Sequence, residues 1–160
     1  MSQQSPVQRS VFDRQLVTEI HIAAAPAEVW SVLTDFTAFT EWNPFITEAT
    51  GSVAVGSRLE VRMEPPGGRA MTFKPLVTEA TEPVSFEWLG RVLMSGMFDG
   101  RHRFDLEETA GGTRLTHSER FTGLMVPMLA RALDTRIRAG FVSLNEALKT
   151  RVEGMVRDTV

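Results

Sequence analysis

Apolar and polar residues alternate near the start of the chain, with the two-residue period of a strand that has one buried face. Leu16, Ile20 and Ile22 occupy even positions, whereas Glu19 and His21 point to the other side. We therefore predict a first strand between Leu16 and Ile22. His21 would lie on its solvent face, where we expect no functional role.

Two short helices are predicted after this strand. Pro26 stands at a favoured first helical position, and Glu28 lies in the first turn, where a carboxylate interacts well with the helix dipole. Apolar residues then follow at helical spacing up to Phe36. A second short turn carries Trp42 and ends before Pro44, because the residue that precedes a proline disfavours the helical conformation.

The strand pattern returns in residues 45–121. Its clearest example is residues 58–64, where three apolar residues alternate with four charged ones. Another strand begins at Met71 and runs to a turn at residues 82–83, and the glycines in residues 110–112 predict a hairpin. We expect about six strands in this region, in antiparallel order because the links between them are short.

The last part of the chain has the period of an amphipathic helix. From Leu129 to Leu148 a large apolar residue recurs every three or four positions. Pro127 fits only in the first turn of a helix, so we expect the helix to begin near Met125 and to reach Glu153. A helix of about 30 residues is about 45 Å long, which is enough to cross a whole sheet.

This order of elements predicts an α+β fold, in which a curved antiparallel sheet of about seven strands wraps around the long C-terminal helix. A strongly twisted sheet cannot contact one helix everywhere, so we expect a cavity lined by side chains from both. Residues 1–13 are predicted to form a flexible N-terminal tail, and residues 14–156 a single ligand-binding domain.

Composition limits the classes of function. The chain has 160 residues, of which 42% are hydrophobic and 23% charged, as in an ordinary globular domain. Its 17 basic and 20 acidic side chains are interspersed, so no basic face is predicted for nucleic acid. It has no cysteine, and no apolar run reaches the ~20 residues that span a bilayer. We expect a soluble cytoplasmic protein with no integral membrane contact, no cofactor and no metal.

Five segments of the chain resemble one known superfamily. They are residues 25–30 (APAEVW), 42–46 (WNPFI), 102–106 (HRFDL), 112–117 (GTRLTH) and 119–123 (ERFTG). In this order they resemble the START-like superfamily, and within it the polyketide cyclase/dehydrase and lipid-transport branch, often labelled SRPBCC. The resemblance implies the helix-grip fold with a deep hydrophobic cavity. The superfamily includes lipid carriers, hormone receptors and aromatase/cyclases, so its fold does not define a reaction.

Two histidines and a carboxylate are the main candidates for chemistry. His117 and Glu119 share a face of the last predicted strand, and the hairpin places His102 on the neighbouring strand. If this face looks inward, the three side chains enter the cavity. They could anchor the polar end of a ligand, or the carboxylate could stabilise an imidazolium and so support a general base. A metal triad is the weakest alternative, because the local spacing of a metal site is missing.

Further residues are expected to line the cavity because they share the inward face of the strands or the apolar stripe of the helix. The predicted ligand-binding set is Trp42, Phe45, Met63, Met71, Phe73, Phe86, Trp88, His102, Phe104, His117, Glu119, Met128, Leu133, Ile137 and Phe141. Methionines suit a cavity that adapts to different shapes, although each could equally fill the core. Trp42 could cap the cavity mouth, but we favour a packing role that holds the short helices to the sheet.

Two main hypotheses of function follow. The first is a binding or carrier protein for a small hydrophobic molecule, such as a lipid, a polyketide-like compound or an aromatic compound, with one polar end oriented by His102 and Glu119. The second is a cyclase- or dehydratase-type enzyme in which His102 or Glu119 moves protons. A protein-interaction role with a vestigial cavity is a third hypothesis, and a homodimer is considered with any of them.

Overall fold

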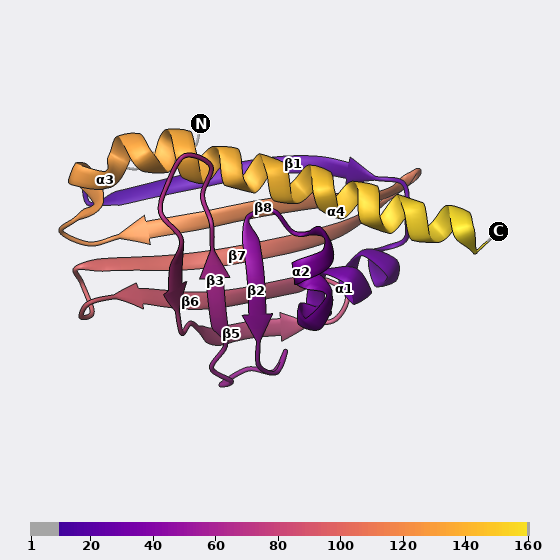
Figure 1. Ribbon diagram of the computed structural model, residues 1–160, viewed down its shortest axis with the longest axis horizontal. Coiled ribbons are helices and arrows are strands. Elements are labelled where there is room, and N and C mark those ends of the chain that lie inside the picture. Colours follow the sequence, from indigo (N-terminus) through magenta and orange to yellow (C-terminus); the bar gives the residue numbers. More distant parts are fainter. Residues whose placement is uncertain (1–9, 160) are drawn as a thin grey trace, which may run out of the picture.

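The molecule is a curved antiparallel sheet with a long helix lying along it (Figure 1). This computed structural model describes residues 10–159. The main sheet has five strands in the order β1-β8-β7-β6-β5, and all neighbours are antiparallel as predicted. The strands are β1 (Asp13–Ile22), β5 (Leu76–Thr81), β6 (Ser85–Val92), β7 (Phe98–Thr109) and β8 (Gly112–Thr122).

Three shorter strands cross in front of the main sheet (Figure 1). They are β2 (Ile46–Thr50), β3 (Glu60–Met63) and β4 (Met71–Phe73), in the order β2-β3-β4. A bridge between Arg58 and Leu76 joins this group to the main sheet, because Leu76 is the first residue of β5. The strands in residues 10–159 thus form one bent wall around an interior.

The sequence predicted about seven strands, and the described residues contain eight. Residues 71–81, predicted as a single strand, form both β4 and β5, with Lys74 and Pro75 between them. Proline has no amide proton to donate to a strand ladder, so it suits a break in pairing. On one side of the break β4 pairs with β3, and on the other side β5 pairs with β6.

The predicted short helices lie between β1 and β2. They are α1 (Pro26–Thr34), a single 3-10 turn (Phe36–Ala38) and α2 (Phe39–Trp42). Pro26 opens α1, and Glu28 accepts a hydrogen bond of 2.8 Å from the amide of residue 25. After α2, the side-chain oxygen of Asn43 accepts hydrogen bonds from the amides of the next two non-proline residues, at 3.1 and 2.9 Å. Asn43 therefore stabilises the turn into β2.

The prediction of one long C-terminal helix is confirmed. It runs through α3 (Val126–Ala132), a π-helical turn (Leu133–Ile137) and α4 (Arg138–Asp158), with helical backbone at each junction. Pro127 lies in the first turn, as expected. The π turn was not predicted. It adds one residue to a helical turn and so changes which side chains face the sheet after it.

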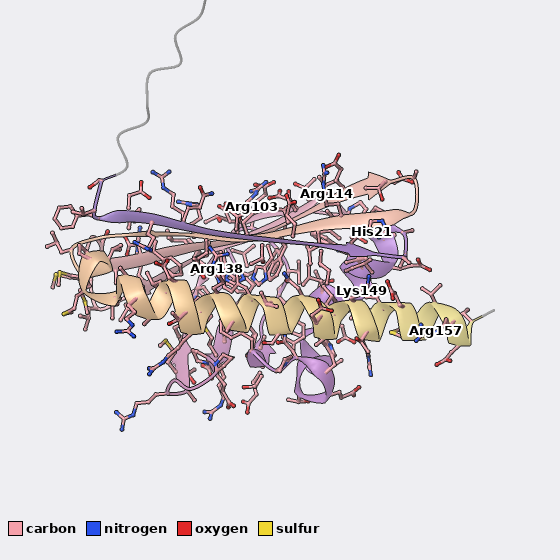
Figure 2. All side chains as sticks on the ribbon, turned by 90° about the horizontal axis from the view of Figure 1, so that it is seen from above. His21, Arg103, Arg114, Arg138, Lys149 and Arg157 are labelled. Carbon is pink, nitrogen blue, oxygen red and sulfur yellow. The ribbon has the colours of Figure 1, made fainter. Side chains whose placement is uncertain are left out.

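The long helix lies beside β1, the edge strand of the main sheet (Figure 2). Arg138 donates a hydrogen bond to the carbonyl of Val17 at 3.3 Å, and Lys149 donates one to the carbonyl of His21 at 2.6 Å. The helix thus covers a strand edge that would otherwise be open to pairing with other chains. His21 itself is exposed, as the sequence pattern predicted.

Large apolar side chains fill most of the interior. Phe141, Leu144 and Leu148 of α4 have no exposed surface. Gly140 allows Phe45 to lie against the helix, because a Cβ atom at this position would be 2.3 Å from the Phe45 ring. The space predicted between sheet and helix therefore closes along much of α4 and is left nearer to α3.

The N-terminal end of the described chain enters the sheet directly. Ser10, Val11 and Phe12 are exposed. β1 begins at Asp13, which is the last residue of the predicted tail. The remainder of that prediction, residues 1–9, lies outside the described residues. None of the helices in residues 10–159 combines the length and the apolar character needed to cross a membrane.

Candidate functional site

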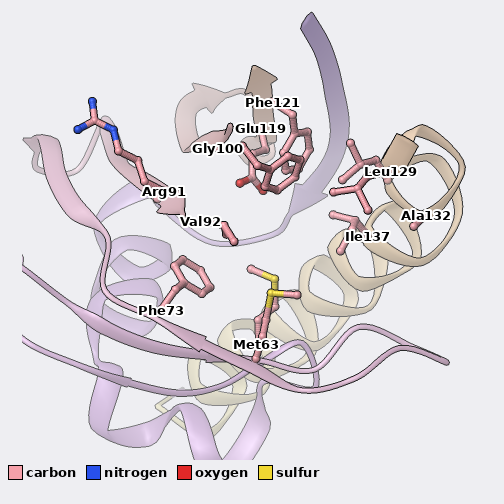
Figure 3. Close-up of a pocket in the computed structure, with 14 residues that line it drawn as sticks. Met63, Phe73, Arg91, Val92, Gly100, Glu119, Phe121, Leu129, Ala132 and Ile137 are labelled. Carbon is pink, nitrogen blue, oxygen red and sulfur yellow. The ribbon is translucent and has the colours of Figure 1, made fainter. Parts of the chain in front are cut away.

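A cavity of about 160 Å³ lies between the main sheet, the β3–β4 hairpin and the first part of the long helix (Figure 3). The π turn supplies part of its wall through Leu133 and Ile137. Met71 and Val92 also border it and are 47% and 40% exposed, so the cavity opens to solvent beside them. The site is therefore a mostly apolar chamber with an open side.

Two glycines create much of this space. Gly90 and Gly100 face each other across β6 and β7, and both line the cavity. A Cβ atom at Gly100 would lie 2.4 Å from Oε1 of Glu119, and one at Gly90 would lie 3.3 Å from the ring of Phe73. Two residues further along the same strands, Trp88 pairs with His102, and their rings occupy the corresponding space.

Glu119 links the cavity to a chain of buried polar side chains. Its Oε2 atom lies 3.0 Å from Nδ1 of His102, which stands directly opposite on β7. Nε2 of His102 lies 2.8 Å from Nε2 of His117, and neither imidazole has exposed surface. The structure thus brings together the three candidates for chemistry, but of these only Glu119 borders the cavity.

The polar chain continues onto the helix and the edge strand. Nδ1 of His117 lies 2.8 Å from Oδ1 of Asn145 in α4. The amide nitrogen of Asn145 donates to the hydroxyl oxygen of Thr18 in β1 at 2.9 Å. The Thr18 hydroxyl in turn donates to the backbone carbonyl of His117 at 3.1 Å. We call Glu119, His102, His117, Asn145 and Thr18 the polar relay.

Aromatic rings enclose the two histidines of the polar relay. His102 stacks on Trp88 with ring centroids 4.6 Å apart, and His117 stacks on Phe141 at 3.9 Å. Burial lowers the pKa of His102 to about 3. Burial, and then the nearby His102, lowers the pKa of His117 well below its usual range, against the opposing effect of the hydrogen bond with Asn145.

The same burial acts in the opposite direction on the carboxyl group. It raises the pKa of Glu119 to about 8, because the ionised form loses its hydration. The imidazolium–carboxylate pair that the sequence suggested as a general base is therefore disfavoured. Near neutral pH the three side chains favour their uncharged forms.

The residues predicted to bind ligand separate into three groups. Those that line the cavity are Met63, Met71, Phe73, Glu119, Leu133 and Ile137. Those that are buried but do not reach it are Phe45, Phe86, Trp88, His102, Phe104, His117 and Phe141. Met128 is 73% exposed on α3, and Trp42 borders a shallow surface depression with Ala147 of α4 while its ring packs edge-on against Phe39.

Several residues of the site were not predicted. The further lining residues are Gly90, Arg91, Val92, Phe98, Gly100, Phe121, Leu129 and Ala132. Asn145 and Thr18 of the polar relay were also missed, although the sequence contains a signal for both. Asn145 interrupts the apolar stripe of the helix, and Thr18 shares the inward parity of Leu16 in the first strand.

The polar relay does not resemble a metal site. Within residues 10–159, no group of three or more His, Cys, Asp or Glu side chains is arranged to hold a metal ion. His102 and His117 each use both ring nitrogens in contacts with other side chains. The arrangement is therefore suited to holding and directing protons and to meeting a ligand through Glu119.

A bent antiparallel wall around a long C-terminal helix, with an apolar cavity between them, defines the helix-grip class of START-like proteins. The sequence profile of the family described as polyketide cyclase / dehydrase and lipid transport matches residues 13–153. The chain belongs to this family. The comparison with curated proteins finds no match.

Solved structures share this fold at low sequence identity. The Zhui aromatase/cyclase from Streptomyces sp. R1128 is 16% identical, with a TM-score of 0.72 over 90% of this chain and 96% of that one. The di-domain ARO/CYC StfQ of the steffimycin biosynthetic pathway is 14% identical, with a TM-score of 0.76 over 96% of this chain. The chain spans 55% of StfQ. Ara h 8.0201 is also 14% identical, with a TM-score of 0.62 over 89% of this chain and 99% of that one.

Proposed function

We propose that this protein binds a small hydrophobic molecule in the cavity beside the π turn, as a carrier or binding protein. The supporting observation is the character of the wall, in which Glu119 and Arg91 are the only charged or polar side chains among the described lining residues. Arg91 points away from the cavity, and its Nε lies 3.7 Å from Oδ1 of Asp99 (Figure 3). Glu119 is thus the polar group that meets the ligand.

The cavity volume limits the part of the ligand that is enclosed. Apolar cavities of about 150 Å³ hold benzene, and this cavity has about 160 Å³. One aromatic ring or a short chain therefore fits inside. The opening beside Met71 and Val92 allows a longer polyketide-like or lipid molecule to extend outwards. Affinity would come from buried apolar area, at about 25 cal/mol per Å².

Native mass spectrometry of the protein, purified without detergent, tests this proposal. We expect a bound small molecule, or binding of toluene or p-cresol when either is added. Ala132→Leu should reduce binding because residue 132 lines the cavity. Ala139→Leu is the matched control, since residue 139 is exposed on the same helix. A wild-type protein that carries no adduct and binds neither compound would contradict the proposal.

An enzyme of the cyclase or dehydratase type is the second candidate. The observation that favours it is the contact of Glu119 with His102 in the cavity wall, because a positioned acid can move a proton to or from a bound molecule. For a compound that the protein converts, Glu119→Gln should lower turnover by about 100-fold or more while the affinity changes little. Unchanged turnover in this variant would exclude the role.

A further inference from the structure

The hydrogen bonds of the polar relay have one consistent direction. Thr18 has a single hydroxyl proton, which it donates to the carbonyl of His117. Its oxygen is therefore the acceptor for the amide group of Asn145, and this turns Oδ1 of Asn145 towards His117. An amide oxygen only accepts, so His117 must carry a proton on Nδ1.

This direction passes through both histidines. A neutral imidazole that is protonated on Nδ1 has a lone pair on Nε2. That lone pair of His117 faces Nε2 of His102 at 2.8 Å, so His102 must supply the proton between them. The other nitrogen of His102 faces Oε2 of Glu119 at 3.0 Å, where a proton is again required. Glu119 and His102 together therefore carry no net charge.

The proton between His102 and Glu119 belongs on the carboxyl group of Glu119. An imidazolium–carboxylate pair would place two charges among apolar and aromatic groups, where their lost hydration is poorly replaced. Across the sheet, Glu119 stands opposite His102 on β7 and the apolar Leu16 on β1. Among the described lining residues the other charged side chain is Arg91 on β6, and it points outwards (Figure 3). Burial shifts the pKa of both Glu119 and His102 towards the uncharged forms.

We propose that Thr18, Asn145 and His117 hold Glu119 in the cavity wall as a neutral carboxylic acid, and that the site selects an uncharged ligand that carries a hydroxyl group. This inference rests on the proposed function. Oε2 is engaged with His102, so Oε1 meets the ligand. Oε1 lies above Gly100, and no donor among residues 10–159 reaches it.

An acceptor without a partner in an apolar wall favours a ligand with a proton to donate. A hydroxyl group supplies that proton without bringing a charge into the cavity. A ligand carboxylate would instead bring a second acceptor and a buried charge towards Oε1. Within the proposed class of ligands, this favours phenols, enols and alcohols over acids and over plain hydrocarbons.

Nitrogen-15 NMR of the histidine rings tests the state of the relay directly. The chain has three histidines, and His21→Gln removes the signals of the one outside the relay. At pH 7 we expect two neutral rings with opposite tautomers, His102 protonated on Nε2 and His117 on Nδ1. The reverse pair of tautomers, or a doubly protonated His102, would overturn the assignment of Glu119 as a neutral acid.

Titration calorimetry with three compounds of similar shape tests the selection of ligand. We expect p-cresol to bind about 3- to 10-fold more tightly than toluene, as one added hydrogen bond predicts. We expect 4-methylbenzoate to bind about 100-fold more weakly than p-cresol, because its charge would be buried without a partner. Equal binding of p-cresol and toluene, or preferred binding of 4-methylbenzoate, would overturn the proposed selection.

Two variants of Glu119 sharpen this test. In Glu119→Gln the new amide group can donate to His102 and still presents its oxygen to the cavity, as a neutral acid does. We therefore expect Glu119→Gln to keep the preference for p-cresol over toluene, and Glu119→Leu to lose it. Loss of the preference in both variants would indicate that a carboxylate is required, which contradicts the proposal.

Thr18 is a positioning residue, because it borders no part of the cavity and acts through Asn145. Thr18→Val removes the acceptor that orients Asn145, so we expect mixed histidine tautomers and a weaker preference for p-cresol. Thr18→Ser keeps the hydroxyl group and should restore both. An unchanged tautomer pattern in Thr18→Val would show that Thr18 does not set the direction of the relay.

The proposed function and this inference fail in different ways. If none of the three compounds binds, the proposed function and the ligand selection fail together, while the histidine tautomers still decide the state of Glu119. If toluene binds as well as p-cresol, ligand binding in the cavity stands and the selection of a hydroxyl group is wrong.

Discussion

The interior of this protein has a filled end and an open end, both built on β6 and β7. At the filled end, Trp88 and His102 stack across the two strands, and Phe141 of α4 covers His117. At the open end, the paired positions are Gly90 and Gly100, and a cavity remains. The same curved wall thus makes a core where its inward side chains are large and an open cavity where they are missing.

Glu119 stands at the boundary between these two ends. One of its oxygens contacts His102 of the filled end, and the other lies above Gly100 of the open end. The filled end therefore controls the protonation of the group that the open end presents to a ligand. Changes to the filled end should alter stability most, whereas changes to the open end should alter binding with little loss of stability.

The largest effect is expected from Phe141→Ala, which removes the ring that stacks on His117 and packs against Phe45. Loss of a fully buried phenylalanine costs about 3–5 kcal/mol. Leu129→Ala at the open end is the comparison, and we expect less than half of that loss because this side chain borders empty space. Urea denaturation measures both, and equal losses would contradict the distinction between the two ends.

The next effect is expected from Asn145→Leu, which removes the partner of His117 Nδ1 and the donor to Thr18. A buried polar group left without a partner costs about 1–3 kcal/mol. Glu146→Leu is a suitable control because the neighbouring side chain is exposed, and such changes stay within about 0.5 kcal/mol. A loss for Asn145→Leu that does not exceed the control would mean that the relay adds nothing to stability.

The pH dependence of stability provides a third test. Burial raises the pKa of Glu119 to about 8, so between pH 6.5 and 8 the folded protein holds a proton that the unfolded chain has released. Stability should therefore fall by about 2 kcal/mol as the pH rises through this window. The side chain of Glu119→Gln cannot ionise, so the stability of this variant should not fall in the same pH window. Urea denaturation at several pH values measures the difference.

At lower pH the two buried histidines give stability the opposite dependence on pH. Burial lowers the pKa of both His102 and His117, so the unfolded chain takes up protons below about pH 6.5 that the folded protein does not bind. Stability should therefore rise from acid pH to a maximum near pH 6.5. Glu119→Gln could leave both the pH of maximum stability and the decrease in stability above it unchanged. That result would show that Glu119 is already ionised in the folded protein.

The smallest effect on stability is expected at the two glycines. A Cβ atom at Gly100 would displace Oε1 of Glu119, whereas one at Gly90 would only contact the Phe73 ring. We expect Gly100→Ala to weaken p-cresol binding by about 10-fold, equal to about 1.4 kcal/mol. Gly90→Ala should retain the preference for p-cresol over toluene, and calorimetry that finds the two variants alike would contradict the role of Oε1.

Local patterns were sufficient to predict much of the fold and part of the site. Alternation identified the inward faces of β1, β7 and β8, and Pro127 located the start of the long helix. The hairpin between β7 and β8 has a two-residue loop, so the strand register follows from its position, and this register places His102 opposite Glu119.

Other features depended on partners that no local pattern identifies. The sequence predicted one strand from Met71 to the turn at residues 82–83, yet β4 and β5 pair with different strands. Asn145 looked like an interruption of an apolar stripe until the fold placed it between His117 and Thr18. Met128 fits the period of the helix but is 73% exposed, and a π turn that the period does not predict follows α3.

The sequence alone determined which side chains of β1, β7 and β8 point inwards, because the period of a strand is a local property of the backbone. It thereby determined the fold class and the polar candidates His102, His117 and Glu119. Only the tertiary structure decided which inward side chains leave a cavity, since an empty volume is what remains after residues from distant elements have packed. It also decided the direction of the polar relay, because that direction requires four separate elements to place their donors and acceptors in one line.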